Sequence, residues 1–345
     1  MVLANYNMGN KARVICEYKG AYKVKNENGE YLAKVTGKQM FNALSREDYP
    51  AVGDWVVIDE LGEGRALIRE ILPRKTIIKR KYNDKNDSQI IATNIDVAFA
   101  IESVDRDFNL NRFERYFAIA RDGGIKPAII LNKIDLISKE ELATKLAQIK
   151  NRLPDIDVIA TSIINDEGIS EFKKYIEKDR TYCFLGSSGV GKSSLINKLL
   201  GKNIIKTENI SFDSGRGKHV TTKREMYFLP ASSADGENGG IVIDNPGMRE
   251  IGMTDASAGI DDLFDEIAIL AKRCKYRDCT HIHETGCAVL SAVESGKIDK
   301  DKYSNYLNLK KESEYYKMSE IEKREKGKQF GKFIKNAKKE LKKYK

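Results

Sequence analysis

One octapeptide constrains the fold of this 345-residue chain more than any other feature. The segment Gly186-Ser-Ser-Gly-Val-Gly-Lys-Ser193 fits the pattern G-x-x-x-x-G-K-[ST], with an apolar strand-like stretch before it and a helical stretch after it. In such a loop the glycines let backbone N–H groups approach phosphate oxygens, the lysine reaches the β and γ phosphates, and the last hydroxyl binds Mg²⁺. We therefore expect a nucleotide, with its Mg²⁺, to be bound by Gly186, Ser187, Ser188, Gly189, Val190, Gly191, Lys192, Ser193 and Ser194.

The segments around this loop alternate between strand and helix patterns. Such alternation predicts βαβ units and a parallel sheet covered by helices on both faces. The expected strands are residues 95–101, 128–131, 158–161, 182–185, 225–229 and 241–243, and the expected helices are residues 110–121, 139–151, 169–178 and 192–200.

Asn132-Lys133-Ile134-Asp135 directly follows one of these strands. In a doubly wound sheet, ligand loops lie at the carboxyl ends of strands. A carboxylate at Asp135 can accept hydrogen bonds from guanine N1–H and N2–H₂, which adenine does not offer, while Asn132 and Lys133 hold the loop and pack on the base. Thr161-Ser162, after another strand, could add a backbone contact to the guanine oxygen. The pattern favours GTP and argues against an ATP-dependent kinase.

A third loop follows residues 241–243, where Asp244-Asn-Pro-Gly247 ends the strand. Asp244 can hold Mg²⁺ through water, and the Gly247 amide can sense the γ-phosphate. The basic stretch between the phosphate loop and this segment carries Thr221 and Thr222, either of which could complete the Mg²⁺ shell.

The order of these motifs differs from that of ordinary small GTPases, in which the phosphate loop comes first. Here Asn132–Asp135 precedes the phosphate loop. A circular permutation explains this order, because it keeps the loops at one edge of the sheet while moving the chain termini.

The two flanking regions have other patterns. Before residue 75, five short alternating segments separated by glycine turns predict a small all-β barrel, and residues 74–87 are expected to be a linker.

Near the other end, Cys274-x₄-Cys279-x-His281-x₅-Cys287 offers three thiolates and an imidazole, a set that Zn²⁺ favours, with His283 as the competing nitrogen. Four protein ligands leave no open position, so this zinc site is expected to be structural.

Charge and composition narrow the partners and the compartment. Residues 310–345 contain 14 Lys/Arg against 6 Glu, most of the chain's net charge of +9, which fits either a solvated helix or a nucleic-acid contact. No apolar run approaches the length of a membrane span, and the N-terminal residues lack the apolar region of a secretory signal. The odd number of five cysteines, three of them close together, favours a reducing compartment and a metal over a disulfide framework. We expect a cytoplasmic protein with no membrane contact.

With these motifs in this order, the chain resembles the ribosome small subunit-dependent GTPase A family, known as RsgA or YjeQ. The resemblance covers nearly the whole chain, including the Phe108-Asn-Leu110 segment, the loop around His219 and the metal spacing. Two departures are His219-Val-Thr-Thr222, where the family has three threonines after the histidine, and Asn245, where it has threonine.

The resemblance implies a multidomain protein: an OB-fold RNA-binding barrel (1–75), a circularly permuted α/β GTPase domain (76–254), and a helical zinc-binding domain with a basic tail (255–345). It further implies GTP hydrolysis to GDP and phosphate, stimulated by the small ribosomal subunit during its late maturation. We also expect the barrel and the basic tail to contact rRNA, and the protein to be a monomer. The resemblance favours His281 over His283 as the zinc ligand.

Hydrolysis needs a group that orients water. Small GTPases often carry glutamine after the Asp-x-x-Gly segment, but here the residue is Met248. The motif and the resemblance point to His219 as the catalytic group beside Lys192, although a histidine there could instead contact RNA or solvent. Arg216, Arg224 and Arg249 are unranked candidates for charge neutralisation.

The rival interpretation is a nucleotide-gated RNA-binding assembly protein in which hydrolysis is incidental.

Overall fold

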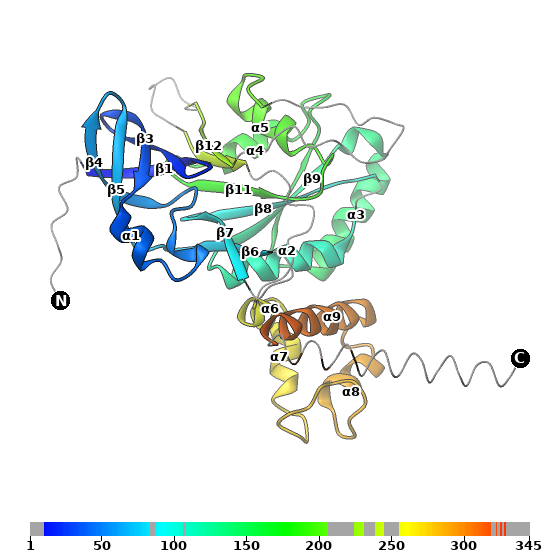
Figure 1. The fold of residues 1–345 in the computed structure, drawn as a ribbon. Helices are drawn as coiled ribbons and strands as arrows, with labels where there is room; N and C mark the ends of the chain where they lie inside the picture. The colour runs from blue at the N-terminus through cyan, green and yellow to red at the C-terminus, as the bar shows by residue number, and fades with distance from the viewer. Residues whose placement is uncertain are drawn as a thin grey trace, which may run out of the picture.

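A computed structural model describes residues 10–82, 87–105, 108–205, 224–230, 239–244 and 255–318, together with 322, 325 and 328. Figure 1 shows a barrel on the left, a central sheet flanked by helices, and a helical unit below them. Among the described helices, none combines the length and the apolar character that crossing a membrane requires.

The barrel closes because β1 pairs with both β2 and β4, while β3 and β5 complete the ring. Inward-facing residues such as Val14, Val24, Ile58 and Ile68 fill its interior and are fully buried. The predicted barrel is confirmed. Its strands are β1 (Lys11–Tyr18), β2 (Ala21–Asn26), β3 (Gly29–Val35), β4 (Trp55–Gly62) and β5 (Arg65–Ile71), and a short helix α1 (Gly37–Asn42) and a 3₁₀ turn η2 (Arg46–Asp48) connect β3 to β4.

The prediction of a linker over residues 74–87 is wrong in part. Residues Ile77–Tyr82 form β6, which pairs antiparallel with β7 (Asp87–Thr93). Its lysines and arginine made the segment look like a solvated linker. Ile78 is nevertheless fully buried in the main core, so burial of one apolar side chain and pairing with β7 override the charged composition.

The central sheet has the order β10-β9-β8-β11-β13-β12. All neighbouring pairs are parallel except β13 and β12, and β12 continues the sheet into barrel strand β1 through the pair Cys16↔Glu225. The strands are β8 (Val97–Ser103), β9 (Lys126–Asn132), β10 (Asp157–Thr161), β11 (Thr181–Leu185), β12 (Glu225–Phe228) and β13 (Ile241–Asp244).

Both faces of this sheet are buried, which is why its strands read as continuous apolar runs. Along β8, Ala98 and Ala100 face one core cluster, whereas Phe99 and Ile101 face the other. The covering helices are α2 (Leu110–Asp122), α3 (Lys139–Arg152), α4 (Ile169–Tyr175) and α5 (Lys192–Leu200), so α4 ends three residues before the predicted helix end.

The C-terminal unit packs against α2, and its apolar residues join the core cluster of the central domain. Asp299 begins its longest helix by accepting a hydrogen bond from the Lys302 backbone N–H. The helices are α6 (Ser257–Leu263), α7 (Asp265–Ala271), α8 (Ala288–Glu294) and α9 (Lys300–Lys317). Most of the predicted basic tail lies outside the described residues.

Candidate nucleotide and metal sites

The predicted phosphate loop joins the buried strand β11 to helix α5. Gly189 and Gly191 have φ values of 86° and 101°, a left-handed conformation that side-chain-bearing residues rarely adopt. A Cβ atom at Gly191 would lie 2.3 Å from the Asn132 amide nitrogen, so glycine is also needed for the close approach of the two loops. The Lys192 ammonium group donates to the carbonyl oxygens of Gly186 and Ser187 at 2.7 and 2.6 Å, which holds it over the loop.

Asn132 fastens this loop to the predicted base loop. It lies at the end of β9 and is fully buried, and its Nδ2 donates to the Val190 carbonyl oxygen at 2.8 Å. The Thr161 hydroxyl, at the end of the adjacent strand β10, donates to Asn132 Oδ1 at 3.0 Å. One amide side chain therefore joins the ends of β9 and β10 to the phosphate loop that follows β11.

Lys133 and Asp135 follow in the same loop. Lys133 has a left-handed φ of 63°, and its ammonium group lies 3.9 Å from an Asp105 carboxylate oxygen. Asp135, in the 3₁₀ turn η3 (Ile134–Leu136), accepts a hydrogen bond from the Ser162 hydroxyl. The backbone N–H of Ser162 donates to the Glu167 carbonyl at 2.9 Å, so Thr161 and Ser162 support the base loop through their side chains.

Asp244 is the last residue of β13 and is buried, with 2% of its surface exposed. Because β13 runs parallel to β11, its carboxyl end lies at the same sheet edge as the phosphate loop. Ser193 and Asp244 offer hydroxyl and carboxylate oxygens, the hard ligands that suit Mg²⁺. His219, Thr221, Thr222 and Gly247 lie outside the described residues.

Arg224, one of the candidates for charge neutralisation, contacts other parts of the chain. Its guanidinium lies 3.2 Å from a Glu17 carboxylate oxygen of β1 and donates to the Ile90 carbonyl of β7 at 3.3 Å. Burial lowers the pKa of Arg224, while Glu17 opposes that shift. Arg224 thus ties the start of β12 to the barrel.

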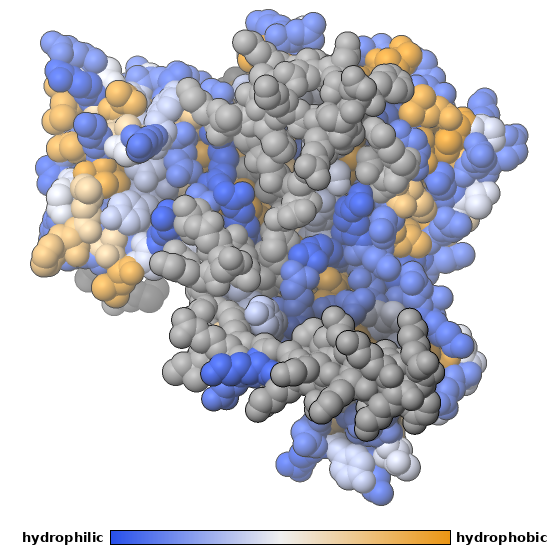
Figure 2. Space-filling view, turned by 45° about the vertical axis from the view of Figure 1, so that its right-hand side comes forward, coloured by the Kyte–Doolittle hydropathy of each residue, from blue (hydrophilic) through white to orange (hydrophobic). Residues whose placement is uncertain are grey.

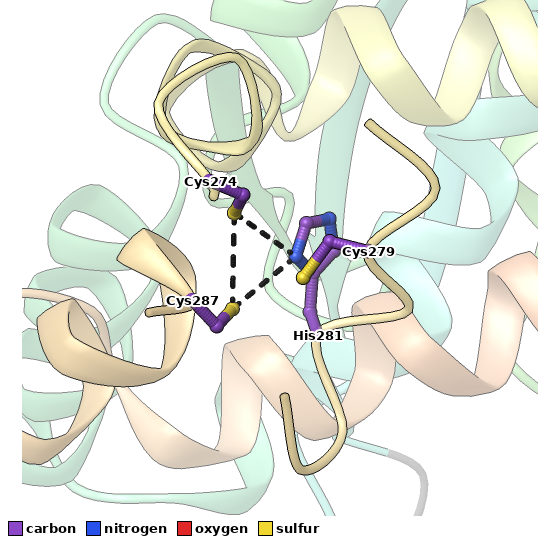
Figure 3. Close-up of side chains that lie close together, drawn as sticks. All are labelled: Cys274, Cys279, His281 and Cys287. Atoms are coloured by element: carbon purple, nitrogen blue, oxygen red, sulfur yellow. Dashed lines mark hydrogen bonds between the residues drawn. The ribbon is translucent and has the colours of Figure 1, made fainter. Parts of the chain in front are cut away.

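The four predicted metal ligands converge in the C-terminal unit (Figure 3), with their ligand atoms all within 4.8 Å of one another. His281 Nδ1 lies 3.6 Å from Cys274 Sγ and 3.4 Å from Cys287 Sγ, and the two sulfurs are 3.8 Å apart. Of the two candidate histidines, His281 is the one that belongs to this cluster, to which Cys279 contributes the remaining sulfur.

Backbone conformation and hydrogen bonds position the metal-ligand side chains. His281 adopts a left-handed φ of 61°, and the Tyr303 hydroxyl donates to its carbonyl oxygen at 2.5 Å. Cys287 caps α8 by accepting from the Leu290 N–H at 3.4 Å. Burial acts to raise the pKa of Cys274, but hydrogen bonds from the backbone N–H groups of Ala288 and Val289, together with those of the Cys287 and Cys279 side chains, bring that pKa below its ordinary value.

Glu284 is a supporting residue that sequence reasoning missed. Its carboxylate accepts from the Thr280 hydroxyl and from the backbone N–H groups of Thr280, Ile282 and His283, the last three at 2.8, 3.0 and 3.1 Å. These bonds, led by that of the Thr280 side chain, hold the pKa of Glu284 well below its ordinary value. Glu284 thus folds the loop that presents His281.

A buried ionic network, also missed from the sequence, connects the central domain to the C-terminal unit. Glu114 of α2 is 0% exposed and accepts from Arg152 Nε and Nη2 at 2.7 and 3.0 Å, and from Asn305 Nδ2 at 2.5 Å. Next to it, Arg115 forms a two-pronged pair with Glu312 of α9 at 2.7 and 2.6 Å. Hydrogen bonds and ion pairs therefore tie helix α2 to both α3 and α9.

Comparison with known proteins gives one family. The family model described as RsgA GTPase matches residues 71–254. A protein of Bacteroides thetaiotaomicron named small ribosomal subunit biogenesis GTPase RsgA 1 is 38% identical over 98% of this chain and 92% of its own length. One of Lactiplantibacillus plantarum, named small ribosomal subunit biogenesis GTPase RsgA 2, is 41% identical over 88% of this chain and 83% of its own length.

Two solved structures share the fold. The structure of YjeQ from Thermotoga maritima has a TM-score of 0.62 and 24% identity, covering 87% of this chain and 96% of that one. YloQ, described as a circularly permuted GTPase, has a TM-score of 0.61 and 23% identity, covering 92% of this chain and 100% of that one.

Proposed function

The chain belongs to the RsgA GTPase family, and on that premise we propose that it hydrolyses GTP as a step in the biogenesis of the small ribosomal subunit. The observation that carries the proposal is the bond between Asn132 and the Val190 carbonyl, which unites a guanine-reading loop and a phosphate loop in one site. Relatives named for this role match the chain over nearly its full length.

The Asp135 carboxylate accepts from the guanine edge, supported by Ser162, while the N–H groups of the phosphate loop bind the phosphates. Lys192 exchanges the carbonyls of Gly186 and Ser187 for phosphate oxygens. The residues that would hold Mg²⁺ are Ser193, Asp244 through water, and Thr221 or Thr222. Bound Mg²⁺ would neutralise charge that develops on the phosphates.

We assign the orientation of the attacking water to His219. Met248 occupies the position after the Asp244–Gly247 segment, and its thioether cannot orient water as a glutamine would. Because Met248 cannot orient water, we expect slow GTP hydrolysis by the protein alone. Stimulation by a partner that positions His219 would then set the rate.

The cysteine and histidine cluster fits one structural Zn²⁺. A tetrahedral zinc ion with bonds of about 2.3 Å to sulfur and about 2.0–2.1 Å to nitrogen places sulfurs ~3.8 Å apart and sulfur and nitrogen ~3.6 Å apart. The distances among Cys274, His281 and Cys287 lie within 0.2 Å of these values. With Cys279 as the fourth ligand, all four positions are filled by protein, which favours a structural role over a catalytic one.

The partner that we propose is the small ribosomal subunit, contacted by a cytoplasmic monomer through rRNA. The barrel and the basic C-terminal region are the proposed contacts. The segment that connects barrel strands β3 and β4 carries large exposed hydrophobic side chains, with Phe41 89% and Leu44 97% exposed. Figure 2 shows hydrophobic residues among hydrophilic ones at the left of the molecule, where the barrel lies. Stacking on aromatic side chains beside basic ones is a common mode of RNA binding.

Co-sedimentation with small ribosomal subunits tests this proposal. The full chain should co-sediment with the subunits in the presence of a non-hydrolysable GTP analogue and much less with GDP. Binding that is equal with both nucleotides would contradict a GTP-controlled role, and binding with neither would contradict the partner.

A further inference from the structure

Asp105 lies beside the loop proposed to read guanine, although it follows the neighbouring strand. That strand, β8, ends at Ser103, which pairs in parallel register with Asn132 at the end of β9. The next backbone N–H, that of Val104, donates to the Asn132 carbonyl oxygen at 3.0 Å. Asp105 is therefore held at the same edge of the sheet as Lys133, the residue that follows Asn132.

The Asp105 carboxylate contacts a different group with each of its oxygens. The Ser103 hydroxyl donates to Oδ1 at 2.5 Å, and the Lys133 ammonium group lies 3.9 Å from Oδ2. The side chains of Lys133 and Asp105 are 23% and 31% exposed, so water and salt screen this ion pair less than a fully exposed one. The hydroxyl orients the carboxylate, and the carboxylate faces the lysine.

Lys133 is the side chain of the base loop that needs such a partner most. A lysine side chain is long and flexible, so it loses much conformational freedom when it is ordered against a ligand. The backbone of Lys133 has a left-handed φ of 63° at the start of turn η3, which fixes where the side chain begins. The carboxylate of Asp105 fixes where the ammonium group ends.

We propose that Asp105 is a positioning residue for nucleotide binding: it holds the Lys133 ammonium group, so that the apolar stem of Lys133 lies ready to pack on the guanine base. Asp105 acts through Lys133 and takes no part in the chemistry. Fixing a side chain before the ligand arrives strengthens binding by reducing the ordering cost. This inference rests on the proposed function, because it requires that a guanine nucleotide binds at this loop.

The sign of the effect separates positioning from simple charge. A nucleotide is an anion, so removing a nearby carboxylate would tighten its binding if Asp105 acted through its charge alone. Positioning predicts the opposite. Asp105→Asn should raise the Kd for GDP by about 2- to 5-fold, the range expected when a partly exposed ion pair is lost. The Kd for a GTP analogue should rise by a similar factor, because both nucleotides carry the same base.

The test is a double-mutant cycle on the full chain with fluorescent GDP and a fluorescent GTP analogue. Asp105→Asn and Lys133→Ala should each weaken binding. In the Lys133→Ala background, Asp105→Asn should weaken binding no further, because its effect passes through the lysine. In steady-state hydrolysis by Asp105→Asn, KM should rise and kcat at saturating GTP should stay within about 2-fold of wild type.

Competition between GDP and XDP gives a second readout. Packing on the face of the base does not depend on the groups at its edge, so Asp105→Asn should keep the wild-type ratio of GDP to XDP affinity. Asp135→Asn should change that ratio, because Asp135 is the residue proposed to meet the base edge.

The matched control is Asp157→Asn, the same change in another lysine–aspartate pair that involves β9. Asp157 lies 2.7 Å from the Lys126 ammonium group, and the two residues begin β10 and β9. Because these strands are parallel, the pair lies at the opposite edge of the sheet from the base loop. Asp157→Asn should therefore bind GDP like wild type.

The possible failures are distinguishable. The positioning role would be overturned by unchanged or tighter GDP binding in Asp105→Asn, by an equal weakening in the Lys133→Ala background, by a changed GDP to XDP ratio, or by an equal loss in Asp157→Asn. If Asp105→Asn does not fold, Asp105→Ala takes its place with the same expected and contradicting results. A wild-type chain that binds neither guanine nucleotide would overturn the proposed function itself.

Discussion

The side-chain amide of Asn132 donates to the backbone carbonyl of Val190 at 2.8 Å, across 58 residues of sequence. In this permuted chain the base loop precedes the phosphate loop in the sequence, and this bond joins the two loops at one edge of the sheet. The bond therefore couples the loop that we propose reads guanine to the loop that we propose holds the phosphates.

Asp135→Asn should weaken GTP binding and shift preference toward xanthine nucleotides. A carboxylate matches the two donors of guanine, whereas an amide presents one donor that meets the N2–H₂ group and can instead pair with the xanthine oxygen. The unpaired polar group should cost about 1–3 kcal/mol. Competition between GDP and XDP for the variant measures the shift, and unchanged GDP affinity would remove Asp135 from base recognition.

Lys192→Ala and Ser193→Ala should each abolish GTP hydrolysis without unfolding the central domain. Lys192 lies over the loop through the Gly186 and Ser187 carbonyls, and its loss removes a phosphate contact rather than a core contact. Steady-state phosphate release and thermal unfolding are measured together. Retained turnover in either variant would be incompatible with the assigned roles.

Zinc removal should unfold the loop region of the C-terminal unit while GDP still binds the central domain. Structural Zn²⁺ contributes roughly 10–16 kcal/mol of apparent binding energy, comparable to the stability of a whole domain. Cys279→Ser and chelation should both raise the hydrogen exchange of residues 274–290. Metal analysis well below about one Zn²⁺ per chain would contradict the site, and unchanged exchange after chelation would contradict its structural role.

Arg152→Met should destabilise the protein far more than Arg121→Met. Arg152 is the main cation on the fully buried Glu114, and breaking a buried pair from one side costs about 3–5 kcal/mol. Arg121 pairs with the largely exposed Asp262, a type of pair that contributes about 0–1 kcal/mol. Urea unfolding followed by tryptophan fluorescence and circular dichroism compares the two, and equal midpoints would contradict the importance of the network.

The phosphate loop, the base loop, the metal ligands and most strands and helices could be predicted from the sequence, because each depends on residues that are close together in the chain. The glycines of the phosphate loop, the Asp135 loop and the cysteine spacing occupy short stretches. The strands of the central sheet are found within a few residues of their predicted ends because both faces are buried and the runs are apolar.

Contacts between distant segments could not be predicted from local pattern. Arg13 of the barrel donates to the Asn94 carbonyl and to the Thr181 hydroxyl, both at 3.0 Å. Because Thr181 is the first residue of β11, this side chain connects the barrel to the central sheet. Its partners lie 81 and 168 residues away, and a lone arginine in a strand gives no sign of them. The network around Glu114 could not be predicted from the sequence for the same reason.

The most direct test of the account is multiple-turnover GTP hydrolysis by the full chain with and without purified small ribosomal subunits. We predict slow turnover alone and an increase of at least about 10-fold with subunits, as expected when a partner completes a GTPase site. His219→Ala should bind GTP normally but lose the stimulated rate. A wild-type rate that small subunits leave unchanged would contradict the central claim and favour an assembly protein that acts through binding alone.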